Sequence, residues 1–160
     1  MARLPTSSAE ITPAWLTERL RSTGTIDAST SVSSIEGDTV GPGIGFMGEV
    51  GRIKVGYSGG SGPTTMICKI PTQDANVRGL LAAARVFERE ARFYADIAPS
   101  LDVVPQAYGI ASDFENDDHV LVLEDQLRRD LPPGDLAEEA IGHASPRSGA
   151  ASRGRGVGAG

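Results

Sequence analysis

The sequence predicts an α+β fold with about five antiparallel strands, one long helix and a short N-terminal helix. Segments rich in β-branched residues alternate with glycine-rich turns, which is typical of antiparallel strands. Residues 73–98 have an apolar period close to that of a helix, which predicts the long helix. The chain ends in a Gly/Ala/Ser/Arg-rich stretch without any apolar period. We therefore expect an N-terminal helix and linker (1–30), a folded domain (31–135) and a linker with a disordered tail (136–160).

The short helix is predicted from Thr12 and Pro13. Threonine is a favourable N-cap because its hydroxyl accepts hydrogen bonds from the first helical amides, and proline suits the first helical position. Trp15, Leu16 and Leu20 give this helix a short apolar face. We expect the helix to pack on the edge of the domain.

A glycine-rich stretch, GIGFMGEV, follows the strand predicted at residues 32–40. Gly43, Gly45 and Gly48 have G-x-G-x-x-G spacing, and Val50 lies two residues further on. Glycines at this spacing allow a tight turn and a close approach of the backbone to phosphate oxygens. In a Rossmann dinucleotide site the last glycine opens a helix. Here the next residues, EVGRIKVGY, have a strand pattern, so we predict a strand–loop–strand flap.

Lys69 is the one charged residue of the next predicted strand, TTMICKIP, which follows the turn SGGSGP. A lysine in an apolar strand either extends its ammonium to water at a sheet edge or pairs with an anion. The strand alone favours the first explanation.

Glu90 lies in the long predicted helix, between two apolar groups that include Phe87 and Phe93. A carboxylate among apolar neighbours requires a cationic partner. Glu88 falls on the opposite flank, near Arg85 and Arg92, and can be an ordinary solvated charge.

Two further strands are predicted after the helix. VVPQAYGIA contains Pro105, which suits a sheet edge or the start of a strand. A polar turn at residues 113–118 leads to HVLVLED, a strongly apolar strand that ends in Glu124 and Asp125.

The composition argues against several classes of partner. A net charge of −6 and a pI of about 4.9 do not favour nucleic acid or an anionic membrane. No segment approaches the roughly 20 apolar residues of a membrane span. With a single cysteine and two scattered histidines, we expect neither a disulfide nor a zinc site. We expect a cytoplasmic protein with a solvated basic tail that does not bind RNA.

The order of these motifs resembles the N-terminal lobe of the protein-kinase-like superfamily. In that fold a glycine-rich flap covers ATP, a lysine on the third strand holds the α- and β-phosphates, and a helix glutamate fixes the lysine. Five segments of the sequence look like the aminoglycoside phosphotransferase and choline-kinase group, and within it most like the ecdysteroid-kinase-like branch. These segments are GFMGEVGRI, ICKIPT, FEREARFY, VPQAYG and LVLED. The resemblance covers roughly residues 32–135.

This resemblance implies ATP- and Mg²⁺-dependent phosphoryl transfer to a hydroxyl of a small molecule. Lys69 would bind phosphate, Glu90 would be its partner, and residues 123–125 would present backbone to the adenine. The implied nucleotide-binding residues are Gly43, Gly45, Phe46, Gly48, Val50, Lys69, Glu90, Leu123, Glu124 and Asp125.

The chain departs from the family after Asp125. The segment RRDLPPGD superficially matches the kinase catalytic loop. It follows Asp125 too closely to leave room for the helices between hinge and catalytic loop, and Asp135 stands where asparagine is required. We therefore expect no catalytic or metal-binding residues in this chain, with the Mg²⁺ ligands supplied by a C-terminal lobe, and a truncated or frame-shifted kinase that is inactive alone.

Three interpretations remain open from the sequence. The chain is the nucleotide-binding lobe of a small-molecule kinase, or a non-catalytic nucleotide-binding or regulatory module that needs a partner lobe. The third is a purely structural fragment in which Lys69 and Glu90 form only an ion pair. The correct order of five motifs favours the first two.

Overall fold

The computed structural model describes residues 3–39 and 47–126. These residues fall within the first of two units of the chain, Met1–Arg129. Gly43, Gly45 and Phe46 of the predicted flap lie outside the described residues, as does the predicted tail.

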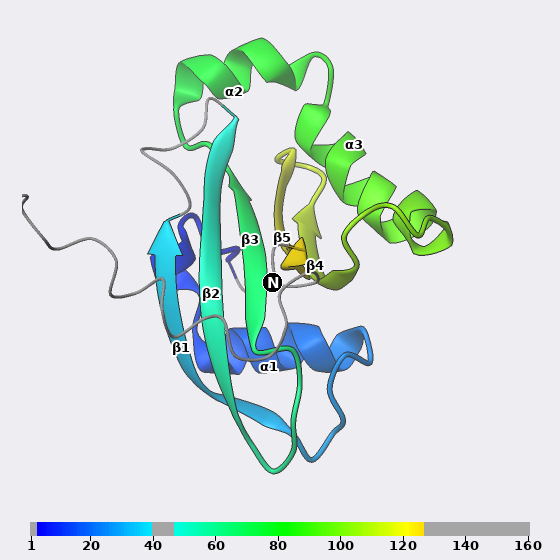
Figure 1. The fold of residues 1–160 in the computed structure, drawn as a ribbon. Coiled ribbons are helices and arrows are strands. Elements are labelled where there is room, and N and C mark those ends of the chain that lie inside the picture. The colour runs from blue at the N-terminus through cyan, green and yellow to red at the C-terminus, as the bar shows by residue number, and fades with distance from the viewer. Residues whose placement is uncertain (1–2, 40–46, 127–160) are drawn as a thin grey trace, which may run out of the picture. The chain divides into compact units, whose positions relative to one another are not determined.

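A five-stranded sheet forms the centre of this unit, with strand order β1-β2-β3-β5-β4 and every neighbouring pair antiparallel (Figure 1). The strands are β1 (Ser31–Thr39), β2 (Gly48–Ser58), β3 (Thr65–Pro71), β4 (Ala107–Asp113) and β5 (Asp118–Glu124). The predicted α+β class and the five antiparallel strands are confirmed. The strand that carries Lys69, β3, is the central one and not an edge.

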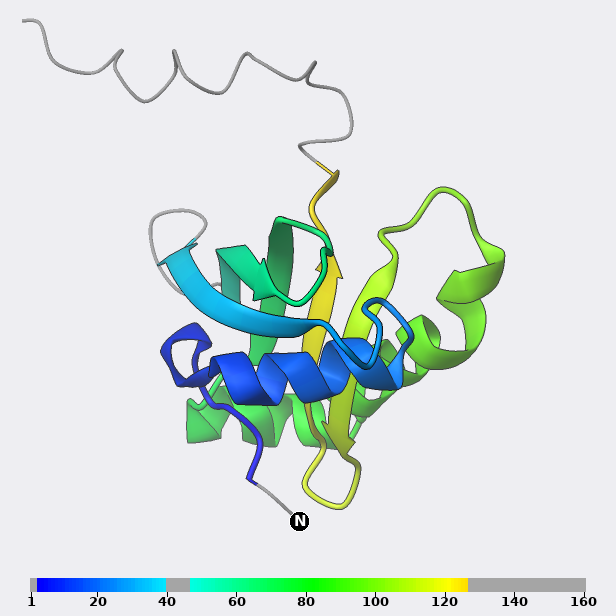
Figure 2. The same ribbon diagram turned by 90° about the horizontal axis from the view of Figure 1, so that it is seen from below.

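Helix α1 (Pro13–Ser22) covers one face of the sheet, as seen in Figure 2. It begins as predicted, with the Thr12 hydroxyl accepting a hydrogen bond from the Trp15 amide at 3.2 Å. A short 3-10 helix, Ser8–Glu10, precedes it. Leu16 and Leu20 are fully buried, so α1 is part of the core and does not merely pack on an edge. The strand residues of this core include Ile53, Val55, Met66, Cys68, Ile70, Val120 and Val122.

The prediction of one long helix over residues 73–98 is wrong. Helix α2 (Ala75–Ala82) ends before a left-handed residue, Arg85 with φ 46°, and α3 (Val86–Arg92) begins directly after it. A π-helical turn (Phe93–Ile97) and a 3-10 turn (Ala98–Ser100) continue the chain. Because the helical period is interrupted, Leu80 does not share a buried face with Phe87 and is 71% exposed.

The turn between β4 and β5 explains where the helix breaks. The Asp117 carboxylate accepts a hydrogen bond from the Glu88 amide at 2.7 Å, in the first turn of α3. The Arg85 guanidinium donates to the Phe114 carbonyl at 2.8 Å, and that of Arg78 on α2 donates to the Asn116 carbonyl at 3.0 Å. These contacts fix both helices to one turn and direct α3 along the sheet.

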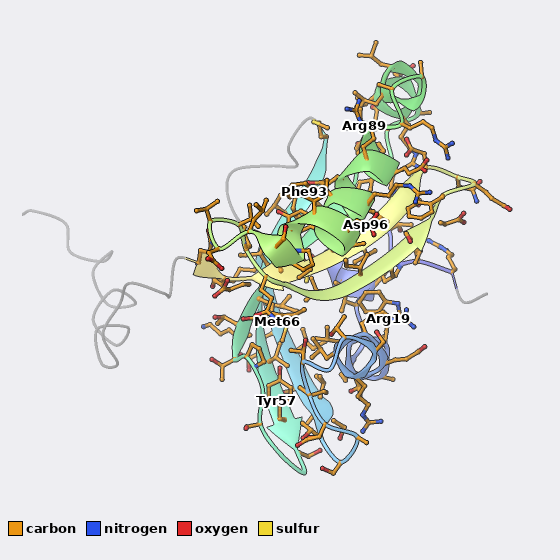
Figure 3. The ribbon with its side chains drawn as sticks, turned by 90° about the vertical axis from the view of Figure 1, so that its right-hand side faces the viewer. Arg19, Tyr57, Met66, Arg89, Phe93 and Asp96 are labelled. Carbon is orange, nitrogen blue, oxygen red and sulfur yellow. The ribbon has the colours of Figure 1, made fainter. Side chains whose placement is uncertain are left out.

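Helix α3 covers the face of the sheet opposite α1, and Figure 3 shows the two helices on either side of the strands. Side chains alternate between the faces of a strand. Since Met66, Cys68 and Ile70 belong to the α1 core, Lys69 of β3 points to the α3 face. His119 and Leu121 of β5 do the same, because Val120 and Val122 belong to the α1 core.

Candidate functional site

Lys69 and Glu90 meet on the α3 face of the sheet. The Lys69 ammonium forms an ion pair and hydrogen bond with Glu90 Oε1. The side chains are 34% and 28% exposed, so the pair is partly open to solvent. Glu90 therefore has the cationic partner that its apolar surroundings required. For Lys69, the explanation by extension to a sheet edge is wrong, and pairing with an anion is right.

His119 is a third member of this cluster, and it was missed at the level of sequence. Its Nε2 lies 3.4 Å from Glu90 Oε2, and its side chain is 1% exposed. Its ring centroid is 6.0 Å from that of Phe87 on α3. The available signal was a histidine at the start of an apolar strand. Its connection to Lys69 depends on the pairing of β3 with β5, which no local pattern shows.

The Glu90 carboxylate is held in its ionised form. Burial alone raises the pKa of Glu90, but hydrogen bonds and charges from His119 and Lys69 outweigh burial and lower the pKa to about 2. At neutral pH the cluster therefore contains an ionised Glu90 carboxylate beside Lys69, whose side chain is partly exposed.

A cavity of about 400 Å³ adjoins this cluster, between the β2–β3 pair and α3. It is lined by Met47, Gly48, Glu49, Val50, Lys69, Ile70, Pro71, Val86, Phe87, Glu90 and His119. Four of the predicted site residues, Gly48, Val50, Lys69 and Glu90, are thus brought together in one place. The walls are largely apolar, so the few polar groups are placed to orient a ligand.

The backbone conformation and the close packing at position 48 both require glycine. The φ of Gly48 is +152°, and a Cβ added there would lie 2.2 Å from the Ile70 carbonyl oxygen. The third glycine of the G-x-G-x-x-G spacing therefore lets β2 approach β3 closely beside Lys69.

The predicted adenine segment, residues 123–125, lies at the other end of β5 from His119 and does not line this cavity. Leu123 is buried, and the Glu124 amide donates to the Gln106 carbonyl at 2.8 Å. The Asp125 carboxylate is 1% exposed and forms an ion pair with Arg52 of β2 at 2.9 Å. The structure thus places Asp125 as a link between β2 and the end of β5.

The expectation that Glu88 of α3 is an ordinary solvated charge is wrong. Its side chain is 11% exposed and not solvated, and it forms ion pairs with both Arg85 and Arg92, the latter at 2.8 Å. The proximity to the two arginines was predicted correctly. Burial follows because α3 turns toward the β4–β5 hairpin after the break at Arg85.

No group of three or more His, Cys, Asp or Glu residues within 3–39 and 47–126 is arranged to hold a metal ion. Among the helices of the same ranges, none is both long and apolar enough to cross a membrane.

Comparison with known protein families identifies a match over the central part of the chain. The model of the ecdysteroid kinase-like family matches residues 42–129, more than half of the 160-residue chain. This range runs from the glycine-rich stretch through β2, β3, α2, α3, β4 and β5. No curated protein and no solved structure matches the chain.

Proposed function

The chain belongs to the ecdysteroid kinase-like family, and from this we propose that it binds Mg·ATP as the nucleotide-binding part of a phosphotransferase acting on a hydroxyl of a small molecule. The kinase-like family makes ATP the expected phosphoryl donor.

The observation that carries the proposal is the Lys69–Glu90 pair at the wall of the cavity. A structural ion pair would be equally stable with both charges turned away from any cavity. Here the lysine is on the central strand, lines the cavity, and its side chain remains 34% exposed. A fixed ammonium beside a cavity is suited to bind phosphate oxygens.

Three features of the described residues fit a nucleoside triphosphate. Lys69 supplies positive charge for the phosphates, and Glu90 fixes the direction of the Lys69 side chain. Val50 offers an apolar side chain from β2 in the same cavity. Mg·ATP, when bound, would supply the transferable phosphoryl group and a cation that neutralises part of its charge.

The remaining predicted residues complete the proposal. Backbone amides of Gly43, Gly45 and Phe46 would cover the phosphates, because the strand that follows them reaches the cavity at Gly48. Residues 123–125 would meet the adenine at the opposite end of β5. The Arg52–Asp125 pair then keeps that end of β5 at a fixed distance from β2.

Calorimetric titration with Mg·ATP tests the proposal. We expect Lys69→Ala to weaken binding by roughly tenfold or more, since a hydrogen bond to a charged group contributes about 1.5–3 kcal/mol. Glu90→Ala should weaken binding less, because it removes the orientation of the ammonium and leaves its charge. Lys54→Ala is the matched control, since Lys54 is an exposed lysine on β2.

Absence of Mg·ATP binding by the unsubstituted protein would contradict the proposal. So would an equal loss of affinity in the Lys54→Ala and Lys69→Ala variants, because it would indicate a non-specific effect of positive charge. A parallel assay for release of phosphate distinguishes binding with turnover from binding alone.

A further inference from the structure

We infer that His119 is a positioning residue, which holds one oxygen of the Glu90 carboxylate so that the other stays directed at Lys69. The inference concerns the geometry of the cluster, and its consequence for nucleotide affinity rests on the proposed function.

The two oxygens of the Glu90 carboxylate contact two different side chains. Lys69 binds Oε1 of Glu90, and His119 Nε2 lies 3.4 Å from Oε2. The charged and polar groups that reach this carboxylate therefore come from two neighbouring strands, β3 and β5, while Glu90 itself comes from α3. A carboxylate held at both oxygens cannot rotate away from the lysine without losing the second contact.

The two side chains that contact Glu90, Lys69 and His119, differ in flexibility and burial. Lysine has a long, flexible side chain, and Lys69 is partly exposed. The His119 side chain is 1% exposed and lies beside the Phe87 ring. Its backbone amide is also held by the Asp118 carboxylate at 3.0 Å. Of the two side chains that contact Glu90, His119 is thus the buried one that anchors the carboxylate, and Lys69 is the partly exposed one that can respond to a ligand.

The polar contact of the His119 imidazole with Glu90 also supports this role. Within residues 3–39 and 47–126, Nδ1 of His119 is buried without a hydrogen-bond partner. The contact to Glu90 is therefore the polar interaction that the imidazole makes with the described part of the chain. A buried polar ring at this position is explained by its action on Glu90, since an apolar ring would fill the space without an unsatisfied nitrogen.

Two substitutions separate this role from simple packing. His119→Gln keeps an N–H donor at a similar reach but loses the ring, whereas His119→Phe keeps a ring and loses the donor. The pKa of the Glu90 carboxyl is then followed by NMR without nucleotide. We expect His119→Phe to raise this pKa from about 2 toward its ordinary value of 4.5. We expect His119→Gln to leave it nearer to that of the unsubstituted protein.

Mg·ATP affinity gives the second readout. We expect His119→Phe to weaken binding by roughly three- to tenfold, and His119→Gln to retain affinity within about twofold, because only the former frees Glu90. A packing role predicts the reverse order, with the phenylalanine variant intact and the glutamine variant impaired. That result, or an unchanged Glu90 pKa in His119→Phe, would overturn the inference.

Nitrogen NMR of the unsubstituted protein covers the case in which a variant does not fold. The chain has two histidines, His119 and His143, so the signals are few. A neutral His119 protonated at Nε2, or a doubly protonated ring, supports the anchor; protonation at Nδ1 alone overturns it.

The failure of the proposed function can be distinguished from the failure of this inference. If Mg·ATP does not bind while the Glu90 pKa responds to His119→Phe, the proposed function fails and the anchoring role of His119 stands. If Mg·ATP binds and Glu90 does not respond, only the anchor fails.

Discussion

At the residue scale, Glu90 shows how a partly buried carboxylate is kept charged. It comes from a helix, and its two partners come from two different strands of the sheet. The free energy of these contacts depends on its ionisation, so the cluster links the stability of the fold to pH.

The Glu90 pKa predicts a specific pH dependence of stability. The folded-state pKa of about 2 is below the ordinary 4.5, so ionised Glu90 stabilises the fold above about pH 4.5 and this contribution disappears as pH falls toward 2. We expect Glu90→Gln to lower the free energy of unfolding in urea at pH 7, by a few kcal/mol. The difference between the two proteins should shrink steadily between pH 5 and pH 2.

The control is Glu36→Gln, which removes an exposed glutamate on β1 and should change stability little at any pH in this range. A constant difference between the Glu90→Gln variant and the unsubstituted protein from pH 7 to pH 2 would contradict the assignment.

At the element scale, the β4–β5 turn determines the direction of α3 and therefore the position of Glu90. Asp117 has a left-handed backbone with φ 48°, and its carboxylate accepts the Glu88 amide at 2.7 Å. The turn thus supplies the first turn of α3 with an acceptor from outside the helix, where a local N-cap side chain is absent.

Replacing Asp117 tests this supporting role. Asp117→Gly retains the left-handed backbone and removes the acceptor, so we expect a loss of about 1 kcal/mol of stability. Asp117→Asn retains both and should lose less. Thermal unfolding measures the difference, and Glu115→Gly at an exposed position in the same turn is the control. Equal melting temperatures for the Asp117→Gly and unsubstituted proteins would contradict the role of Asp117.

The elements divide into those that local sequence predicts and those that it does not. The strands and the start of α1 follow from alternation, turn residues and the Thr12–Pro13 pair, all of which act within a few residues. The break at Arg85 depends on Phe114 and Asp117, about thirty residues later in the chain. The helical period over residues 73–98 continues through the break, so it contains no sign of the turn that causes it.

The candidate site divides in the same way. Lys69 and Glu90 stand out because each is a charge among apolar neighbours, which requires a partner. His119 does not, since it comes near Lys69 through the antiparallel pairing of β3 with β5, in which Lys69 lies opposite Leu121. The ion pair of Asp125 with Arg52 likewise depends on the spatial order of the strands.

At the scale of the whole described unit, one face of the sheet forms the hydrophobic core and the other carries the candidate site. Its α1 face is closed by Leu16, Leu20 and the strand residues of the core, all of them apolar and buried. Its α3 face carries the Lys69–Glu90–His119 cluster and a cavity. Because β3 contributes Cys68 to one face and Lys69 to the other, neighbouring residues of one strand serve stability and the site respectively.

This division predicts opposite effects for substitutions on the two faces. Leu20→Ala removes a fully buried side chain of the α1 face and should lower stability by about 2–5 kcal/mol. Its Mg·ATP affinity, corrected for the folded fraction, should remain within about twofold of the unsubstituted protein, because the α3 face is untouched. Lys69→Met retains the aliphatic stem and should lose Mg·ATP affinity whatever its effect on stability, because it removes the ammonium from the wall of the cavity. Urea unfolding and calorimetry on the same samples measure both quantities. If Leu20→Ala lowered the affinity of the folded protein as much as Lys69→Met does, the two faces would be coupled, and the sheet would not act as the rigid partition that its fully buried α1 core indicates.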